Sequence, residues 1–148
     1  MKYLLILFSF CCVIPALATE MLTFTCERAE NNYTETYELK IIPGSKTQKA
    51  KVFVDDRDLD RADELGRQAI KSVVVTDSTV LFTMEAHFPP ESFDGIQYGA
   101  GSVETVVNIN RLTGQLRKSE DIRGGILSAT LGEGIKVYQE QCSPIKTP

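Results

Sequence analysis

Apolar and polar residues alternate along most of the chain with a period of two, which is typical of half-buried β-strands. The alternating segments are 22–27, 33–41, 50–54, 72–75, 79–85, 102–110, 114–118 and 134–142. Most of them are joined by short turns rich in Gly, Pro, Asp or Ser, such as 43–45 and 76–78. About eight strands connected in this way predict a mainly β fold, an antiparallel meander.

The N-terminal 18 residues have the three parts of a secretory signal peptide. Lys2 supplies a positive start, an unbroken apolar run covers 3–14, and residues 16–18 place small side chains where a signal peptidase cuts. The run is shorter than the about 20 apolar residues of a membrane-spanning helix, and we expect no transmembrane segment. We therefore expect cleavage after Ala18, a mature chain beginning at Thr19, and a secreted or periplasmic protein.

Four cysteines divide into two pairs with different expected roles. Cys11 and Cys12 raise the alternative of a lipoprotein acylated at its cleavage point, but bulky Phe10 stands where a small residue would be required. We interpret both as apolar filler of the signal peptide. The remaining pair, Cys26 and Cys142, predicts one disulfide, because exported proteins keep even numbers of cysteines bonded.

The expected disulfide indicates how the edges of the sheet are arranged. Unpaired strand edges template aggregation, and closing a sheet into a barrel removes them. Cys26 lies in the first predicted strand and Cys142 in the last, and bonded cysteines have Cα atoms within about 7 Å. The first and last strands should therefore be neighbours, in a closed or nearly closed small barrel.

The length of the chain indicates how many domains it forms, and its net charge limits the kinds of partner that we expect. Of 148 residues, 148 less 18, or 130, remain after cleavage, which suits one domain over residues 19–148. Without Lys2 the chain has 15 basic and 20 acidic residues, a net charge of 15 minus 20, or −5. Nucleic acid and anionic membrane surfaces both require a concentrated cationic face, so neither is an expected partner. The pattern predicts no oligomeric state.

The most charged segment, 55–66, permits two interpretations. Three aspartates have the spacing of the first ligands of a calcium-binding loop: Asp56, Asp58 and Asp60. However, Arg61 occupies the position of the required glycine, and Arg67 that of the closing glutamate. An apolar stripe favours a short helix near residues 58–71 instead: Leu59, Ala62, Leu65, Ala69 and Ile70. We expect that helix, and no metal site.

Catalytic chemistry has few candidates. His87 is the single histidine, and no Gly-x-Ser-x-Gly turn accompanies it. The expected disulfide consumes the thiols, and no zinc-spaced cluster of His and Cys occurs. Carboxylate pairs such as Glu91 with Asp94 could serve acid–base chemistry, but a sequence does not show their separation. We expect no catalytic residue and no cofactor, and the enzyme question stays open.

The segment from 87 to 102 is the most unusual connection, because it has two prolines, three glycines and three aromatics between two convincing strands. Long connections in compact domains often carry function. His87, Phe88, Phe93 and Tyr98 are therefore candidate residues of a partner-binding loop. The alternative is that the aromatics fold back and fill one end of the barrel as core.

The segment INRLTGQL, residues 109–116, is typical of a hairpin turn with Arg111 as a solvated or locally hydrogen-bonded side chain, and the alternative is that Arg111 is a functional contact of the hairpin. Together with KVYQEQC at 136–142 it resembles the ending of small exported bacterial β proteins, which have an Ile-x-Arg-x-Thr-Gly hairpin and a near-terminal Cys. The resemblance implies bacterial export and a compact β fold, and it supplies no catalytic residue. In architecture the chain is also similar to small β-barrel inhibitors of lysozyme, although no inhibitory loop motif is present.

Three classes of function remain. A non-enzymatic binding or inhibitor-like module, with an envelope or extracellular protein as partner, fits the small size, the disulfide and the aromatic segment. The alternative is a structural or stress-related envelope protein, which leaves the aromatic segment unexplained. A hydrolase ranks last, because no nucleophile and base come together in the sequence.

Overall fold

The computed structural model describes residues 21–29 and 32–144. The expected signal peptide and the start at Thr19 lie outside the described residues. The strands are β1 (Leu22–Ala29), β2 (Thr34–Ile42), β3 (Lys51–Val54), β4 (Arg57–Asp58), β5 (Arg61–Asp63), β6 (Gly66–Val75), β7 (Thr79–Phe88), β8 (Glu91–Phe93), β9 (Ile96–Tyr98), β10 (Gly101–Asn110), β11 (Gln115–Gly124) and β12 (Gly134–Pro144). A helix, α1 (Gly125–Leu131), separates the last two strands.

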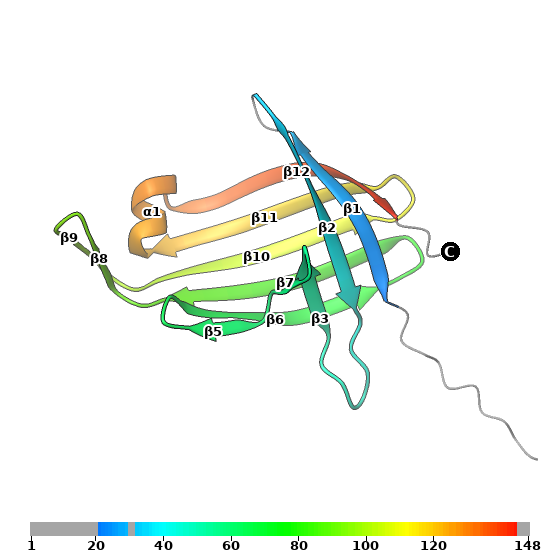
Figure 1. Ribbon diagram of the computed structural model, residues 1–148, viewed down its shortest axis with the longest axis horizontal. Coiled ribbons are helices and arrows are strands. Elements are labelled where there is room, and N and C mark those ends of the chain that lie inside the picture. Colours follow the sequence, from blue (N-terminus) through cyan, green and yellow to red (C-terminus); the bar gives the residue numbers. More distant parts are fainter. Residues whose placement is uncertain (1–20, 30–31, 145–148) are drawn as a thin grey trace, which may run out of the picture.

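Ten of the strands form one antiparallel sheet in the order β4-β3-β2-β1-β12-β11-β10-β7-β6-β5. The long strands β6, β7, β10, β11 and β12 make a curved wall, and β1, β2 and β3 cross over it from the other side (Figure 1). The two edge strands of the order, β4 and β5, follow each other in the chain. The sheet is therefore a nearly closed barrel, as the alternation and the cysteines predict.

The first and last strands of the barrel are neighbours. Cys26 of β1 stands opposite Cys142 of β12 in the antiparallel register, and their sulfurs are 2.10 Å apart, a disulfide-bonding distance. Both side chains are buried. The expected pair and the expected contact between the first and last strands are both confirmed.

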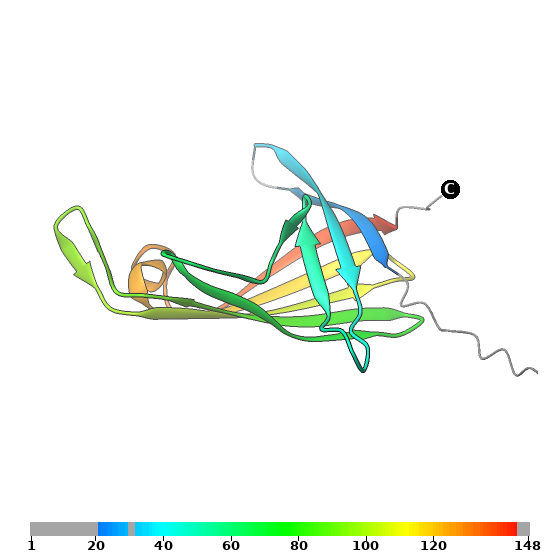
Figure 2. The same ribbon diagram turned by 60° about the horizontal axis from the view of Figure 1, so that its bottom comes forward.

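The seam between the two edges is closed by side chains instead of a backbone ladder. The Asp60 carboxylate accepts the Ile70 N–H at 2.6 Å, and the Gln68 amide donates to the Leu59 carbonyl at 2.7 Å. Figure 2 shows β3 and β4 rising away from the paired strands β5 and β6. At the seam, two side-chain hydrogen bonds thus replace the backbone hydrogen bonds that join neighbouring strands elsewhere in the sheet.

The prediction of a helix near residues 58–71 is wrong, because this segment contains the end of β4, all of β5 and most of β6. Strand β6 pairs with β7 along its length, with one bulge between Ile70 and Ser72, and that ladder outweighs a local apolar stripe of helical spacing. The preceding acids favour turns: Asp55 and Asp56 have positive φ angles of 48° and 63°. The helix formed within residues 21–29 and 32–144 is α1, which packs against β10 and β11.

The hydrophobic core occupies one end of the barrel, which we call the closed end. Its members come from the parts of the strands next to the 76–78 and 111–113 turns: Phe24, Leu39, Ile41, Val52, Ile70, Val80, Phe82, Val107, Ile109 and Leu116, with the two bonded cysteines. All are 4% exposed or less. The apolar face of each strand therefore points inward, and the other half of the barrel has to be filled in another way.

Candidate functional site

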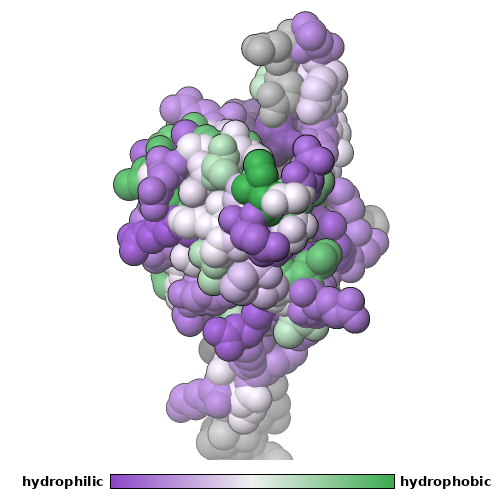
Figure 3. Space-filling model, turned by 90° about the vertical axis from the view of Figure 1, so that its left-hand side faces the viewer, coloured by the Kyte–Doolittle hydropathy of each residue, from purple (hydrophilic) through white to green (hydrophobic). Residues whose placement is uncertain are grey.

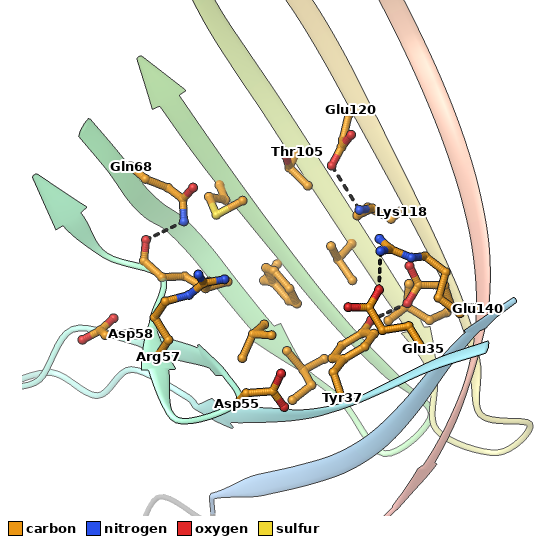
Figure 4. Close-up of a pocket in the computed structure, with 18 of the residues that line it drawn as sticks. Glu35, Tyr37, Asp55, Arg57, Asp58, Gln68, Thr105, Lys118, Glu120 and Glu140 are labelled. Atoms are coloured by element: carbon orange, nitrogen blue, oxygen red, sulfur yellow. Dashed lines mark hydrogen bonds and ion pairs between the residues drawn. The ribbon is translucent and has the colours of Figure 1, made fainter. Parts of the chain in front are cut away.

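A cavity of about 490 Å³ lies inside the other half of the barrel, which we call the open end (Figure 4). The floor of the cavity is the side of the core that faces the open end. It consists of seven apolar side chains: Leu39, Val54, Leu59, Phe82, Met84, Val107 and Leu116. Its walls are polar, although their residues lie at inward-facing positions of the same strands. The cavity therefore has an apolar bottom and a charged upper part.

One wall of the cavity, formed by β1, β2 and β12, has a buried carboxylate. Glu140 is 7% exposed, and its Oε2 accepts a hydrogen bond from the Tyr37 hydroxyl. Burial raises the pKa of the Tyr37 phenol, and the hydrogen bond to Glu140 raises this pKa further. Beside them, Arg28 forms an ion pair with Glu35 across the β1–β2 register. The phenol therefore stays a donor to Glu140 well into the alkaline range.

The adjoining wall on β11 has a second ion pair. The Lys118 ammonium is 3.1 Å from the Glu120 carboxylate and 4.7 Å from the centre of the Tyr138 ring on β12, within the range of a cation–π contact. The side chains of Lys118 and Glu120 are both 23% exposed. This pair is partly shielded from solvent and is internally neutral.

The opposite wall is the short β4–β5 segment, which also forms the seam. In Figure 4 the Arg57 side chain points into the cavity, and the Asp58 carboxylate points away from it. Asp58 instead pairs with Lys51 at 2.5 Å, and this hydrogen bond lowers the pKa of Asp58. Arg61 also lines the cavity, and its Nε is 3.7 Å from Asp63, which is too long for a hydrogen bond.

The lining defines which side-chain groups a molecule in the cavity would contact. None of the described residues that line the cavity is Ser, Cys or His. In residues 21–29 and 32–144, no group of three or more His, Cys, Asp or Glu is placed to hold a metal ion. What the cavity offers is apolar contact at the bottom and charged hydrogen-bond donors and acceptors above it.

The aromatic residues selected from the sequence do not line this cavity. The segment from 87 to 102 forms the end of β7, the hairpin of β8 and β9, and the start of β10. Phe93 and Ile96 face each other in that hairpin and are 65% and 56% exposed. Phe88 and Tyr98 are half-buried. Phe93 therefore does not fill the barrel end, and the hairpin projects from the sheet (Figure 1).

His87 lies outside the cavity as well. Its Nε2 is 3.0 Å from Glu85 on the same strand, and Glu85 also pairs with Lys71 at 2.9 Å. The ammonium of Lys71 lowers the pKa of Glu85, with a smaller contribution from His87. This is a partly exposed ion-pair cluster on β6 and β7 that contacts neither the cavity nor the β8–β9 hairpin tip.

Arg111 connects two turns at the closed end. Its Nη1 donates to the Thr76 carbonyl at 2.6 Å, and its backbone N–H donates to Ser78 at 2.8 Å. Nearby, Gly114 has a φ of 76°, and a Cβ there would lie 1.9 Å from the Cys142 carbonyl oxygen. The Arg-x-Thr-Gly hairpin is thus explained by packing, because it ties the β6–β7 turn and the β12 strand together.

The cavity residues were missed by the sequence analysis, although a signal was present. Lys118 and Glu120 share the strand face of buried Leu116, and Glu140 shares that of Cys142. At the open end of the barrel, these charged residues occupy inward-facing positions of the strands, where the alternation would otherwise place apolar residues. Their meeting across β11 and β12 depends on register, which alternation alone does not reveal.

Comparisons with models of known protein families, with curated protein sequences and with solved structures found no match for this chain. Among residues 21–29 and 32–144, no helix has the length and apolar character needed to cross a membrane. The site must therefore be interpreted from its own geometry.

Proposed function

We propose that this chain is an exported, non-enzymatic binding protein whose ligand occupies the cavity at the open end. The observation that carries the proposal is the cavity of about 490 Å³ with its apolar floor and charged walls. Small-molecule sites in proteins have about 300–1,000 Å³ and combine apolar lining with a few placed polar groups. The cavity has this size and this composition.

The cost of building such a cavity supports a functional reason for it. Glu140 is buried, and removing a charge from water costs free energy unless hydrogen bonds and ion pairs offset it. A barrel selected only for stability would fill this half with aliphatic side chains, as the closed end does. Retaining Glu140, Lys118 and Glu120 at inward positions is consistent with selection for a ligand.

The compartment is part of the same proposal. The Cys26–Cys142 disulfide is typical of oxidising compartments such as the periplasm or the cell exterior, and the N-terminal segment resembles a signal peptide. A secreted or periplasmic location would give the open end direct access to small molecules of the envelope.

A second candidate function is docking to an envelope or extracellular protein through the β8–β9 hairpin. The observation that favours it is the exposure of Phe93 and Ile96, 65% and 56%. Figure 3 looks onto the end of the molecule that bears this hairpin, and hydrophobic residues lie there as separate spots among hydrophilic ones. Single aromatic anchors of this kind are frequent at interface hot spots.

Ligand binding in the cavity is tested with decan-1-ol, an uncharged amphiphile, by isothermal titration calorimetry. We expect saturable binding with a negative heat-capacity change, because apolar surface is buried. Met84→Trp should fill the cavity and abolish the heat. Val74→Trp is the matched control, because Val74 is 52% exposed on β6 and outside the cavity. Equal binding by both variants would place the ligand elsewhere and refute the proposed site.

The second candidate is tested with Phe93→Ala in capture assays against envelope extract and lysozyme-type enzymes. If the hairpin is an anchor, the melting temperature should stay nearly unchanged, while capture of a specific protein should weaken by about 2 kcal/mol or more. Undiminished capture by the variant would exclude the hairpin as the anchor and leave cavity binding unaffected.

A further inference from the structure

The charges around the cavity indicate which kind of ligand it binds. We infer that the ligand is an anionic amphiphile, an apolar chain with one carboxylate or phosphate head, and that Arg57 and Arg61 hold the head. This inference rests on the proposed function, because it names the ligand class of the same cavity. It depends on which charged side chains of the cavity walls already have a partner within the protein.

The acids that face the cavity are already satisfied. Glu35 pairs with Arg28, Glu120 with Lys118, and Glu140 accepts the Tyr37 hydroxyl. The two aspartates at the rim are also engaged by other groups: Asp55 accepts the Glu38 N–H at 2.8 Å, and Asp58 pairs with Lys51. Each of these carboxylates therefore already has at least one hydrogen-bond or ion-pair partner within the protein.

The cations of the β4–β5 wall differ from those of the opposite wall. Within residues 21–29 and 32–144, the Arg57 guanidinium makes no ion pair and no hydrogen bond, and Arg61 has one long ion pair, 3.7 Å to Asp63. Both residues line the cavity, and Figure 4 shows the Arg57 side chain pointing into it. Among the described lining residues, Arg57 is thus the cation without an acidic partner, and the guanidinium donors still available to a ligand belong to this wall.

The positions of the two arginines suit a head-and-chain molecule. Arg57 stands opposite Val54, a residue packed against the core, and Arg61 stands opposite Gln68. Between them in the chain, Leu59 packs against the same core. An apolar chain lying on Leu59 and Val54 would bring its head within reach of both guanidinium groups. Arginine presents several N–H donors in a planar fork that matches carboxylate and phosphate oxygens.

The experiment compares four ligands that share a decyl chain and differ in the head: decanoate, decyl phosphate, decan-1-ol and decyltrimethylammonium, each below its micelle concentration. Binding to the purified protein is measured by calorimetry at low and high salt. We expect both anions to bind about tenfold or more tightly than the alcohol, because charged hydrogen bonds add to the apolar contact. The cation should bind more weakly than the alcohol. Inorganic phosphate and acetate test whether a head alone suffices.

Variants assign the preference to residues. Arg57→Gln and Arg61→Gln should each remove most of the advantage of decanoate over decan-1-ol, because the anionic head loses a charged donor. Arg117→Gln is the matched control, because Arg117 is exposed on the outward face of β11 and its loss changes the net charge equally. Circular dichroism and thermal melting verify that all three variants fold.

The outcomes distinguish the preference for an anionic ligand from ligand binding in the cavity itself. Equal affinity for anion and alcohol, or a preference that Arg117→Gln reduces as much as Arg57→Gln, would overturn the anionic ligand and leave cavity binding standing. Failure of all four decyl compounds would overturn both. Tight binding of inorganic phosphate without a chain would show an anion site that does not need the apolar floor, and would also contradict the inference.

Discussion

The two ends of the barrel are built from the same strands but by opposite means. At the closed end the inward positions hold aliphatic and aromatic side chains such as Ile41, Val80 and Ile109, each 0% exposed. At the open end the same phase of neighbouring strands holds Lys118, Glu120 and Glu140 around a cavity. One packed end, tied by a disulfide, can thus stabilise a small barrel while the other end remains hollow.

The energetic consequence is an uneven distribution of stability. Side chains at the closed end contact neighbours on all sides, so truncating them removes both transfer free energy and packing. Side chains that face the cavity already contact open space on one side and lose less when truncated. Mutations of similar size should therefore have very different effects at the two ends.

The largest effect is expected from removing the disulfide at the border of the core, with Cys26→Ser and Cys142→Ser together. The bridge closes a loop with a sequence separation of 116, and in the loop-entropy model its loss should cost about 4 to 5 kcal/mol of unfolding free energy. Urea unfolding of the double variant measures this. A change below about 1 kcal/mol would show that core packing alone holds β1 against β12.

Ile109→Ala should cost about 3 to 4 kcal/mol, because this fully buried side chain leaves a void in the closed end. Met84→Ala at the floor of the cavity should cost about 1 kcal/mol. Chemical denaturation of both variants compares the ends directly. Equal costs would contradict the contrast between a packed and a hollow end.

Asp60→Ala tests the seam between the two edge strands of the sheet, β4 and β5. The change removes the acceptor of the Ile70 N–H and the ion pair with Lys49, and an unsatisfied buried donor costs about 2 kcal/mol. Hydrogen exchange of the Ile70 amide should accelerate more than that of amides in β10. Unchanged exchange at Ile70 would mean that the seam is held by other contacts.

Tyr37→Phe should cost about 1 kcal/mol at neutral pH, because Glu140 loses a donor. The folded state raises the pKa of Tyr37 above its ordinary value of 10.0, so its contribution to stability is complete below that value and is lost as pH rises above it. Denaturation from about pH 9 to pH 11 should show a flatter alkaline decline in the variant than in the parent chain. A parallel decline in both would contradict the assigned donor role.

Much of the fold could be predicted from the sequence, because burial of one strand face is a local property. The alternation over 33–41 and 102–110 predicts β2 and β10, and the positions of Cys26 and Cys142 predict which strands meet. The segment 58–71 could not be predicted in this way. Its apolar spacing suits a helix, but pairing with β7 offers backbone hydrogen bonds that only a distant strand can supply.

The candidate site shows the same division. The exposed aromatic hairpin around Phe93 could be selected from its composition, because prolines and glycines between two strands are visible locally. The cavity could not, since Arg57, Lys118 and Glu140 are far apart in the chain and each resembles an ordinary surface residue. Only register and barrel closure bring them to one hollow.

By itself, the sequence determined the strand periodicity, the disulfide pair and the nearly closed barrel, because each follows from spacing along the chain and from the reach of a covalent bond. Tertiary structure decided which end of the barrel is packed and which is hollow. The physical reason is that burial and ion pairing depend on neighbours across the sheet. Glu140 is buried because β1, β2 and β11 surround it, and Arg57 faces the cavity because β4 folds back along β3 at the seam.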